Sequence, residues 1–135
     1  MTSITVEYLG DFHCKATHGP SGHEITTDLP PDNGGRGEFF SPTDLIPTSL
    51  ATCVLTILAK VANRLEVSLN GVRCEVEKIM VADPDRRIGT IRTVVRLPAA
   101  LNQKQRTILE RAALACPVHR SLGNRIELPI EFRYE

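Results

Sequence analysis

The sequence predicts one domain of the α+β class, in which mainly antiparallel sheet packs against helices. Three observations predict it. Segments that alternate apolar and polar residues, as strands do, occur in clusters and do not alternate one by one with predicted helices along the chain. An apolar segment of helical length separates the first cluster from the second. A chain of 135 residues is the size of one domain with one core, so residues 1–135 are expected to form a single domain.

The first third of the chain predicts an antiparallel meander of three strands. Residues 4–8 and 12–17 alternate apolar and polar side chains, as half-buried strands do. A turn rich in glycine follows at residues 19–22, and a third strand is expected over 25–29. Residues 30–37 contain glycines and prolines in close succession and predict a loop.

A helix start follows this loop. Ser41 is a good N-cap, Pro42 suits the first helical position, and Asp44 stands where a capping box needs an acceptor. The helix is expected to run to about Arg64 with a kink at Pro47. Apolar residues cover most of its circumference, which predicts burial nearly all round. One short chain cannot easily cover so large an apolar surface, so we expect a dimer that buries this helix between subunits.

The second half predicts a hairpin, a helix and a final strand. Residues 72–77 and 91–97 alternate in the manner of two paired strands. A second helix is expected between residues 102 and 116. The last strand is expected over 126–134, and Pro129 within it indicates an edge of the sheet.

The composition excludes several classes of protein. The formal net charge is zero, aromatic residues are 4% of the chain and tryptophan is absent, which argues against a nucleic-acid partner. The N-terminus lacks the features of a secretory signal, and the apolar stretch 45–59 looks too short and polar to span a membrane. We therefore expect a cytoplasmic protein. In that compartment its four cysteines are core residues, metal ligands or redox-active thiols.

Two of these cysteines could form a redox pair. Cys53 and Cys116 lie on different predicted helices that must pack on the same sheet. Thiols on facing helices are what a dithiol–disulfide cycle requires. The attacking thiolate needs a nearby cation, for which Arg36, His119 and Arg120 are candidates. Each cysteine could equally be a small buried core residue.

Other chemistry has weaker support. Cys14, His18, Cys116 and His119 could together form a zinc set, although structural zinc pairs usually have tighter spacing. Cys74 alternates with apolar neighbours and is expected in the core. Nucleotide-binding glycine motifs and the nucleophile elbow of hydrolases are missing, so no cofactor is predicted.

The motif residues together resemble the OsmC/Ohr family over nearly the whole chain. They are SPTDL at residues 41–45, Cys53 on the apolar helix, and ACPVH at residues 115–119. The resemblance implies an OsmC-like fold in which antiparallel sheets surround two long central helices of an intertwined homodimer. It also implies a thiol peroxidase that reduces organic hydroperoxides as part of an oxidative-stress response.

The resemblance assigns roles residue by residue. Cys53 corresponds to the peroxidatic cysteine and Cys116 to the resolving one, with their disulfide recycled by a dithiol such as a lipoylated protein. The glutamate of the Ohr branch is replaced by Thr43, and an acid follows one residue later at Asp44. The N-terminal hairpin has no arginine, whereas Arg36 resembles the loop arginine of the OsmC branch. This pattern indicates the OsmC-like branch.

Three functional hypotheses follow. The first is a hydroperoxide reductase with a small apolar substrate, a dithiol reductant and no membrane or nucleic-acid partner. The second is a dimer of the same fold without peroxidase activity that binds a small molecule or acts as a scaffold. The third is a metal-binding protein that uses the zinc set above.

Overall fold

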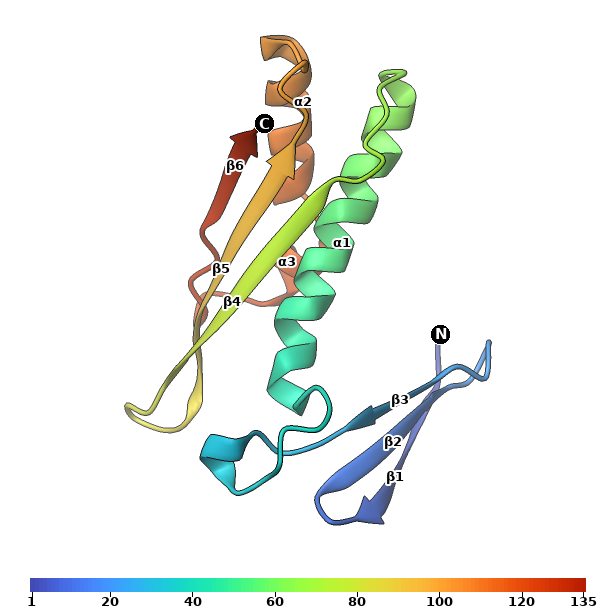
Figure 1. Ribbon diagram of the computed structural model, residues 1–135, viewed down its shortest axis with the longest axis vertical. Coiled ribbons are helices and arrows are strands. Elements are labelled where there is room, and N and C mark those ends of the chain that lie inside the picture. The colour runs from blue at the N-terminus through green and yellow to red at the C-terminus, as the bar shows by residue number, and fades with distance from the viewer. The chain divides into compact units, whose positions relative to one another are not determined.

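A computed structural model describes all 135 residues and divides them into two compact units, Met1–Ile46 and Pro47–Glu135 (Figure 1). Each unit contains a three-stranded sheet, and helices lie between and after the strands in the sequence. The mixed α+β class predicted from the sequence is confirmed.

The first unit contains the predicted meander. Strands β1 (Ile4–Gly10), β2 (His13–His18) and β3 (Glu24–Thr27) pair antiparallel in the order β1-β2-β3. The third strand ends two residues earlier than expected. Beyond it the chain pairs with a different segment, because Thr27 forms an isolated parallel bridge with Phe40 and the backbone N–H of Asp28 donates to the carbonyl of Phe40 at 3.1 Å.

The two faces of this sheet differ sharply. The register places apolar side chains of all three strands on one face, and the larger ones, which stay about half exposed or more, are Ile4, Val6, Tyr8 and Ile25. On the opposite face Lys15 lies between Glu7 and Glu24, at 3.9 and 3.8 Å from their carboxylates. Within its own unit, therefore, the apolar face has no covering layer.

A loop connects this sheet to the first helix. It contains one short 3-10 turn, η1 (Pro31–Asn33), and Gly35 immediately beyond it. A Cβ atom at Gly35 would lie only 2.0 Å from the carbonyl oxygen of Leu29. Only glycine therefore allows the loop to fold back so closely on the end of the strand.

Helix α1 (Pro42–Arg64) begins with the predicted capping box. The backbone N–H of Ser41 donates to Oδ2 of Asp44 at 2.9 Å, and the N–H of Asp44 donates to Oγ of Ser41 at 3.1 Å. The helix continues through Pro47, which is buried and does not end it. Burial nearly all round is not seen within one chain. The fully buried residues form one stripe with a spacing of four: Leu50, Val54, Leu58 and Ala62.

By length and composition alone, α1 could cross a membrane. This differs from the expectation drawn from residues 45–59, because the helix extends to 23 residues. The buried stripe of α1 belongs to the core of the second unit. A core helix of a soluble protein satisfies the same test, and packing within the chain accounts for the apolar residues of this one stripe.

The sheet of the second unit combines a hairpin with a parallel edge strand. Strands β4 (Arg73–Val81) and β5 (Arg87–Leu97) pair antiparallel, and β6 (Ile130–Tyr134) pairs parallel with β5. The order β4-β5-β6 makes β6 an edge strand, as Pro129 predicted. The strand is shorter than the predicted 126–134, since only an isolated bridge between Thr90 and Glu127 precedes it.

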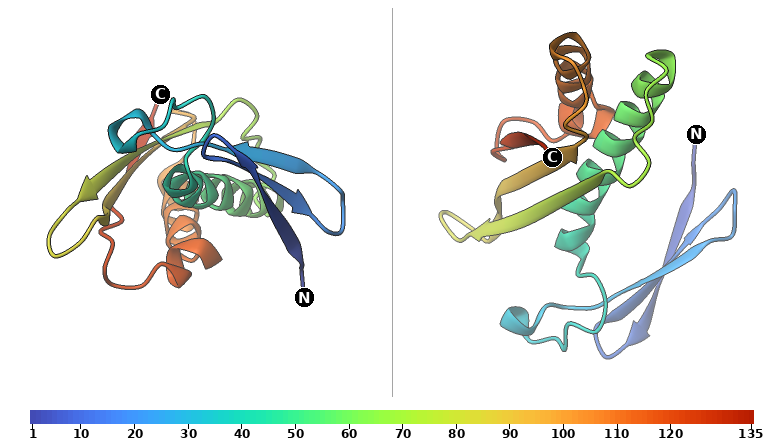
Figure 2. Two further views of the ribbon diagram at one scale, coloured as in Figure 1. Left: turned by 90° about the horizontal axis from the view of Figure 1, so that it is seen from below. Right: turned by 45° about the horizontal axis from the view of Figure 1, so that its top comes forward.

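Helices α1 and α2 (Gln103–Leu114) pack on one face of this sheet, and the short α3 (Pro117–Ser121) follows α2 (Figure 2). Helix α2 starts with the predicted capping box of Asn102 and Gln105. The core combines buried residues of both helices, the sheet and the start of α3: Leu50, Val54, Leu58, Ala62, Ile88, Ile91, Val95, Leu97, Leu101, Leu109, Ala113 and Cys116.

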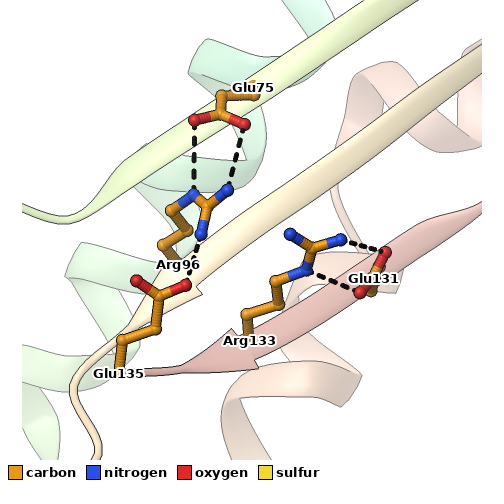
Figure 3. A network of polar contacts seen from close by, with 5 residues as sticks. All are labelled: Glu75, Arg96, Glu131, Arg133 and Glu135. Atoms are coloured by element: carbon orange, nitrogen blue, oxygen red, sulfur yellow. Dashed lines mark hydrogen bonds and ion pairs between the residues drawn. The ribbon is translucent and has the colours of Figure 1, made fainter.

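The other face of this sheet carries charged side chains. Arg96 of β5 contacts Glu75 of β4 at 3.3 Å and also Glu135, while Arg133 of β6 contacts Glu131 at 2.6 Å (Figure 3). Such partly exposed pairs contribute little individually to stability, and of these only the Arg96–Glu75 pair joins two neighbouring strands. The redox candidates therefore lie on the opposite, helix-covered side.

Candidate functional site

The fold brings the thiols of Cys53 and Cys116 together. Cys53 lies in the fourth turn of α1 and is partly exposed, whereas Cys116 precedes α3 and has no exposed surface. Their side chains form a hydrogen bond. The 63-residue separation in sequence contained no sign of this contact, which arises because α1 and the α2–α3 connection share one core.

The turn into α3 positions the second thiol. Cys116 is the N-cap of α3, and Pro117 occupies the first helical position. The sulfur of Cys116 accepts a hydrogen bond from the backbone N–H of His119 at 3.4 Å. A thiol that replaces the usual serine or aspartate at an N-cap is thereby fixed in one orientation.

The surroundings of Cys116 shift the pKa of its thiol. Burial raises the pKa of the Cys116 thiol, and the hydrogen bond with Cys53 raises it further. The backbone amides of His119 and Val118 oppose this effect but do not overcome it. Cys116 therefore retains its proton at neutral pH and can donate its S–H toward the sulfur of Cys53.

The other two cysteines lie elsewhere. Cys74 on β4 packs against the core, as predicted, and burial followed by the charge of Glu75 raises its pKa to about 11. Cys14 lies on β2, in the first unit, on the apolar face of that sheet. Neither contributes to the thiol pair.

The predicted cation and acid both belong to the first unit. The side chain of Arg36 is 74% exposed, and its guanidinium contacts Glu38 at 3.4 Å. The carboxylate of Asp44 accepts the N–H of Ser41 in the capping box. Two further cations predicted from the sequence, His119 and Arg120, are on α3 and so belong to the same unit as the thiols.

The predicted zinc set divides between the units. Cys14 and His18 lie on β2, whereas Cys116 and His119 lie at α3. His18 is the last residue of β2 and not part of a turn, and its Nδ1 atom is 2.5 Å from Oγ of Ser21.

A different group of possible ligands was missed by the sequence analysis. His13, Asp28 and Glu38 each offer one ligand atom, and these atoms lie within 4.8 Å of one another. The three residues come from a strand, a strand end and a loop, so they share no motif or spacing. Only the folded loop, which Gly35 allows, brings them together.

The α+β fold thus places the partly exposed Cys53 of α1 beside the buried Cys116 at the start of α3. A family model described as OsmC-like protein matches residues 35–131, most of the chain. The chain belongs to the OsmC/Ohr family. A search of curated proteins found no match.

Solved structures agree with this assignment. A protein of Psychrobacter arcticus, described as an osmotic stress induced and detoxification response protein, is 42% identical with a TM-score of 0.91, and the match covers 98% of this chain and 96% of that one. An organic hydroperoxide resistance protein OsmC of Legionella pneumophila shares 20% identity with a TM-score of 0.76, and the match covers 98% of this chain and 96% of that one. The organic hydroperoxide resistance protein OhrB of Bacillus subtilis shares 17% identity with a TM-score of 0.71, and the match covers 98% of both chains. The last two likenesses show the fold alone.

Proposed function

We propose that this protein is a thiol peroxidase that reduces organic hydroperoxides, with Cys53 as the peroxidatic cysteine and Cys116 as the resolving one. The observation that carries the proposal is the hydrogen bond between the two thiols, in which the fully buried Cys116 retains its proton. Membership of the OsmC/Ohr family supports it. Cys53 is the more accessible of the two and can meet a substrate.

The proposed cycle has three balanced steps. The thiolate of Cys53 attacks the terminal peroxide oxygen, the O–O bond breaks, and with one proton the products are the alcohol and a Cys53 sulfenic acid. The thiol of Cys116 then attacks this sulfur, and water leaves as the Cys53–Cys116 disulfide forms. Finally an external dithiol reduces the disulfide and is itself oxidised to a disulfide.

Resolution without large motion is the advantage of this arrangement. A disulfide requires the two Cα atoms to be close and the Cβ vectors to converge. The interaction between the two thiols supports such an approach, because their side chains already lie close together. Apolar residues on the same helix, including Leu55 and Ile57, favour an alkyl hydroperoxide over hydrogen peroxide.

Arg36 is the proposed cation for the Cys53 thiolate. Its guanidinium is mostly exposed, and its ion-pair partner Glu38 is itself partly exposed. Little free energy would therefore be lost if Arg36 left Glu38 for the Cys53 thiolate. For Asp44 we propose a positioning role, because its carboxylate holds the first turn of α1 through the capping box. Cys53 lies on the same helix nine residues later.

A homodimer is part of the proposal. The exposed apolar residues of the first sheet and the sides of α1 that remain exposed in one chain are surfaces that a second copy could cover. In the proposed dimer the α1 helices of both copies are central. Size-exclusion chromatography with light scattering tests this directly. A mass near 14.9 kDa, that of one chain, would contradict the dimer.

The chemistry is tested by intact mass and peptide mapping after one equivalent of cumene hydroperoxide is added to reduced protein. The expected result is a loss of about 2 Da, because two hydrogens leave on disulfide formation, mapped to Cys53–Cys116. Cys74→Ser is the matched control and should give the same product. An unchanged mass, or slow oxidation of all four cysteines, would favour the alternative of a small-molecule-binding or scaffold dimer.

A further inference from the structure

We propose that His13, Asp28 and Glu38 form a binding site for a divalent first-row metal ion, separate from the thiol pair. The ligand atoms are Nε2 of His13, Oδ2 of Asp28 and Oε2 of Glu38. One imidazole and two carboxylates form a ligand set suited to ions such as Mn²⁺ and Zn²⁺. The proposal concerns the first unit alone.

The spacing of the three groups fits an ion better than a direct hydrogen bond. Nε2 of His13 lies 3.4 Å from the Asp28 oxygen and 3.9 Å from the Glu38 oxygen. Charge-assisted hydrogen bonds are shorter, at about 2.7 to 2.9 Å. Ligand atoms that each lie about 2.1 Å from a common ion are separated by roughly 3.0 to 3.5 Å. The His13–Asp28 distance of 3.4 Å already fits this range, whereas the Glu38 oxygen, at 3.9 Å from Nε2 of His13, must move closer when an ion binds.

An unsatisfied buried atom points to a missing ligand. Nε2 of His13 is buried and has no hydrogen-bond partner of acceptable geometry. Buried polar atoms without a partner are rare and costly. A metal ion between the three groups would satisfy this nitrogen and both carboxylates together.

Two of the ligands are already held in place. The carboxylate of Asp28, whose side chain is 1% exposed, accepts the backbone N–H of Leu29 at 2.7 Å and that of Glu38 at 3.1 Å. The ring of Phe39 packs edge-on against His13, with 5.5 Å between ring centroids. Such outer contacts orient metal ligands and reduce the entropy lost on binding.

The carboxylates supply the charge that an ion needs. The carboxylates of Asp28 and Glu38 both face the imidazole of His13 and bring two acidic groups to the site. Arg36 contacts the other oxygen of Glu38, Oε1, and leaves Oε2 directed toward His13. The Arg36 guanidinium therefore reduces the net negative charge of the site and does not occupy the position proposed for the metal ion.

The test is a titration of full-length protein with Mn²⁺. Binding is monitored as the loss of the free Mn²⁺ signal in electron paramagnetic resonance. Mn²⁺ is the appropriate probe because it prefers oxygen and nitrogen ligands and avoids thiolates. We expect one ion per chain. His13→Gln and Glu38→Gln should each weaken binding about ten-fold or more, since even outer-shell changes cost 10–100-fold.

Matched controls separate this site from general surface binding. His23→Gln and Glu7→Gln remove an exposed histidine and an exposed carboxylate of the same unit, and each should change affinity less than about two-fold. Cys53→Ser should bind Mn²⁺ as the wild type does. Absence of binding at millimolar Mn²⁺, or equal affinity in His13→Gln, would overturn the proposal. Circular dichroism of each variant confirms that it is folded.

Discussion

The thiol of Cys116 is hydrogen-bonded to that of Cys53, while the turn into α3 holds its sulfur with the backbone N–H of His119 at 3.4 Å. Burial raises the pKa of Cys116 and keeps its thiol protonated at neutral pH. The partly exposed Cys53 is the neighbour with which Cys116 would form a disulfide. The two cysteines therefore differ in burial, and this difference supports the separate roles proposed for them.

Replacing either member of the pair should have a distinct effect. Cys53→Ser should abolish turnover of cumene hydroperoxide, because the attacking sulfur is lost. Cys116→Ser should allow the first attack but stop at a Cys53 sulfenic acid, which a dimedone adduct detects by mass. Cys74→Ser is the control and should retain most of the activity. Undiminished turnover in Cys53→Ser would refute the proposed mechanism.

Alkylation of Cys74 should depend steeply on pH. Its pKa is raised to about 11, so at pH 8 only about one thiol in a thousand is ionised. Its labelling rate with iodoacetamide should rise roughly ten-fold per pH unit up to that pKa. Peptide mass mapping of samples taken at timed intervals between pH 7 and 10 measures this labelling rate. Rapid, pH-independent labelling of Cys74 would contradict its burial in the core.

Asp44 can be tested with a pair of substitutions. Asp44→Asn keeps an oxygen that can accept the N–H of Ser41. Asp44→Ala loses this reciprocal hydrogen bond of the capping box and should cost about 1 kcal/mol of stability. If Asp44 acts through the capping box, Asp44→Asn retains more turnover and a higher urea midpoint than Asp44→Ala. Equal loss of turnover in both variants, with Asp44→Asn still stable, would show that the negative charge itself is needed.

Asp28 should make stability depend on pH in the acid range. Its pKa is lower in the folded chain than the ordinary value of 3.8, so the ionised form favours folding. This contribution is fully present above the ordinary value and is lost as pH falls through the lower folded value. The difference in urea midpoint between wild type and Asp28→Asn should therefore be largest near neutral pH and shrink below pH 3.8. A difference that stayed constant down to pH 2 would contradict this account.

Much of the fold could be predicted because it depends on local patterns. Alternation predicted the first hairpin and the β4–β5 hairpin, and the Ser41–Asp44 and Asn102–Gln105 boxes located both main helix starts. The ends of strands were less accurate. The predicted last strand began at 126, yet regular pairing begins at Ile130, because pairing with β5 depends on residues distant in sequence.

By itself, the sequence determined the class of fold, the family and the two cysteines of interest, because turn chemistry, periodicity and motif spacing are written in neighbouring residues. Only the tertiary structure decided that the Cys53 and Cys116 thiols meet and that burial raises the pKa of Cys116. It alone also revealed the group of His13, Asp28 and Glu38. Contacts between side chains on separate elements, and the loss of hydration that shifts a pKa, depend on how those elements pack and leave no periodic trace in the chain.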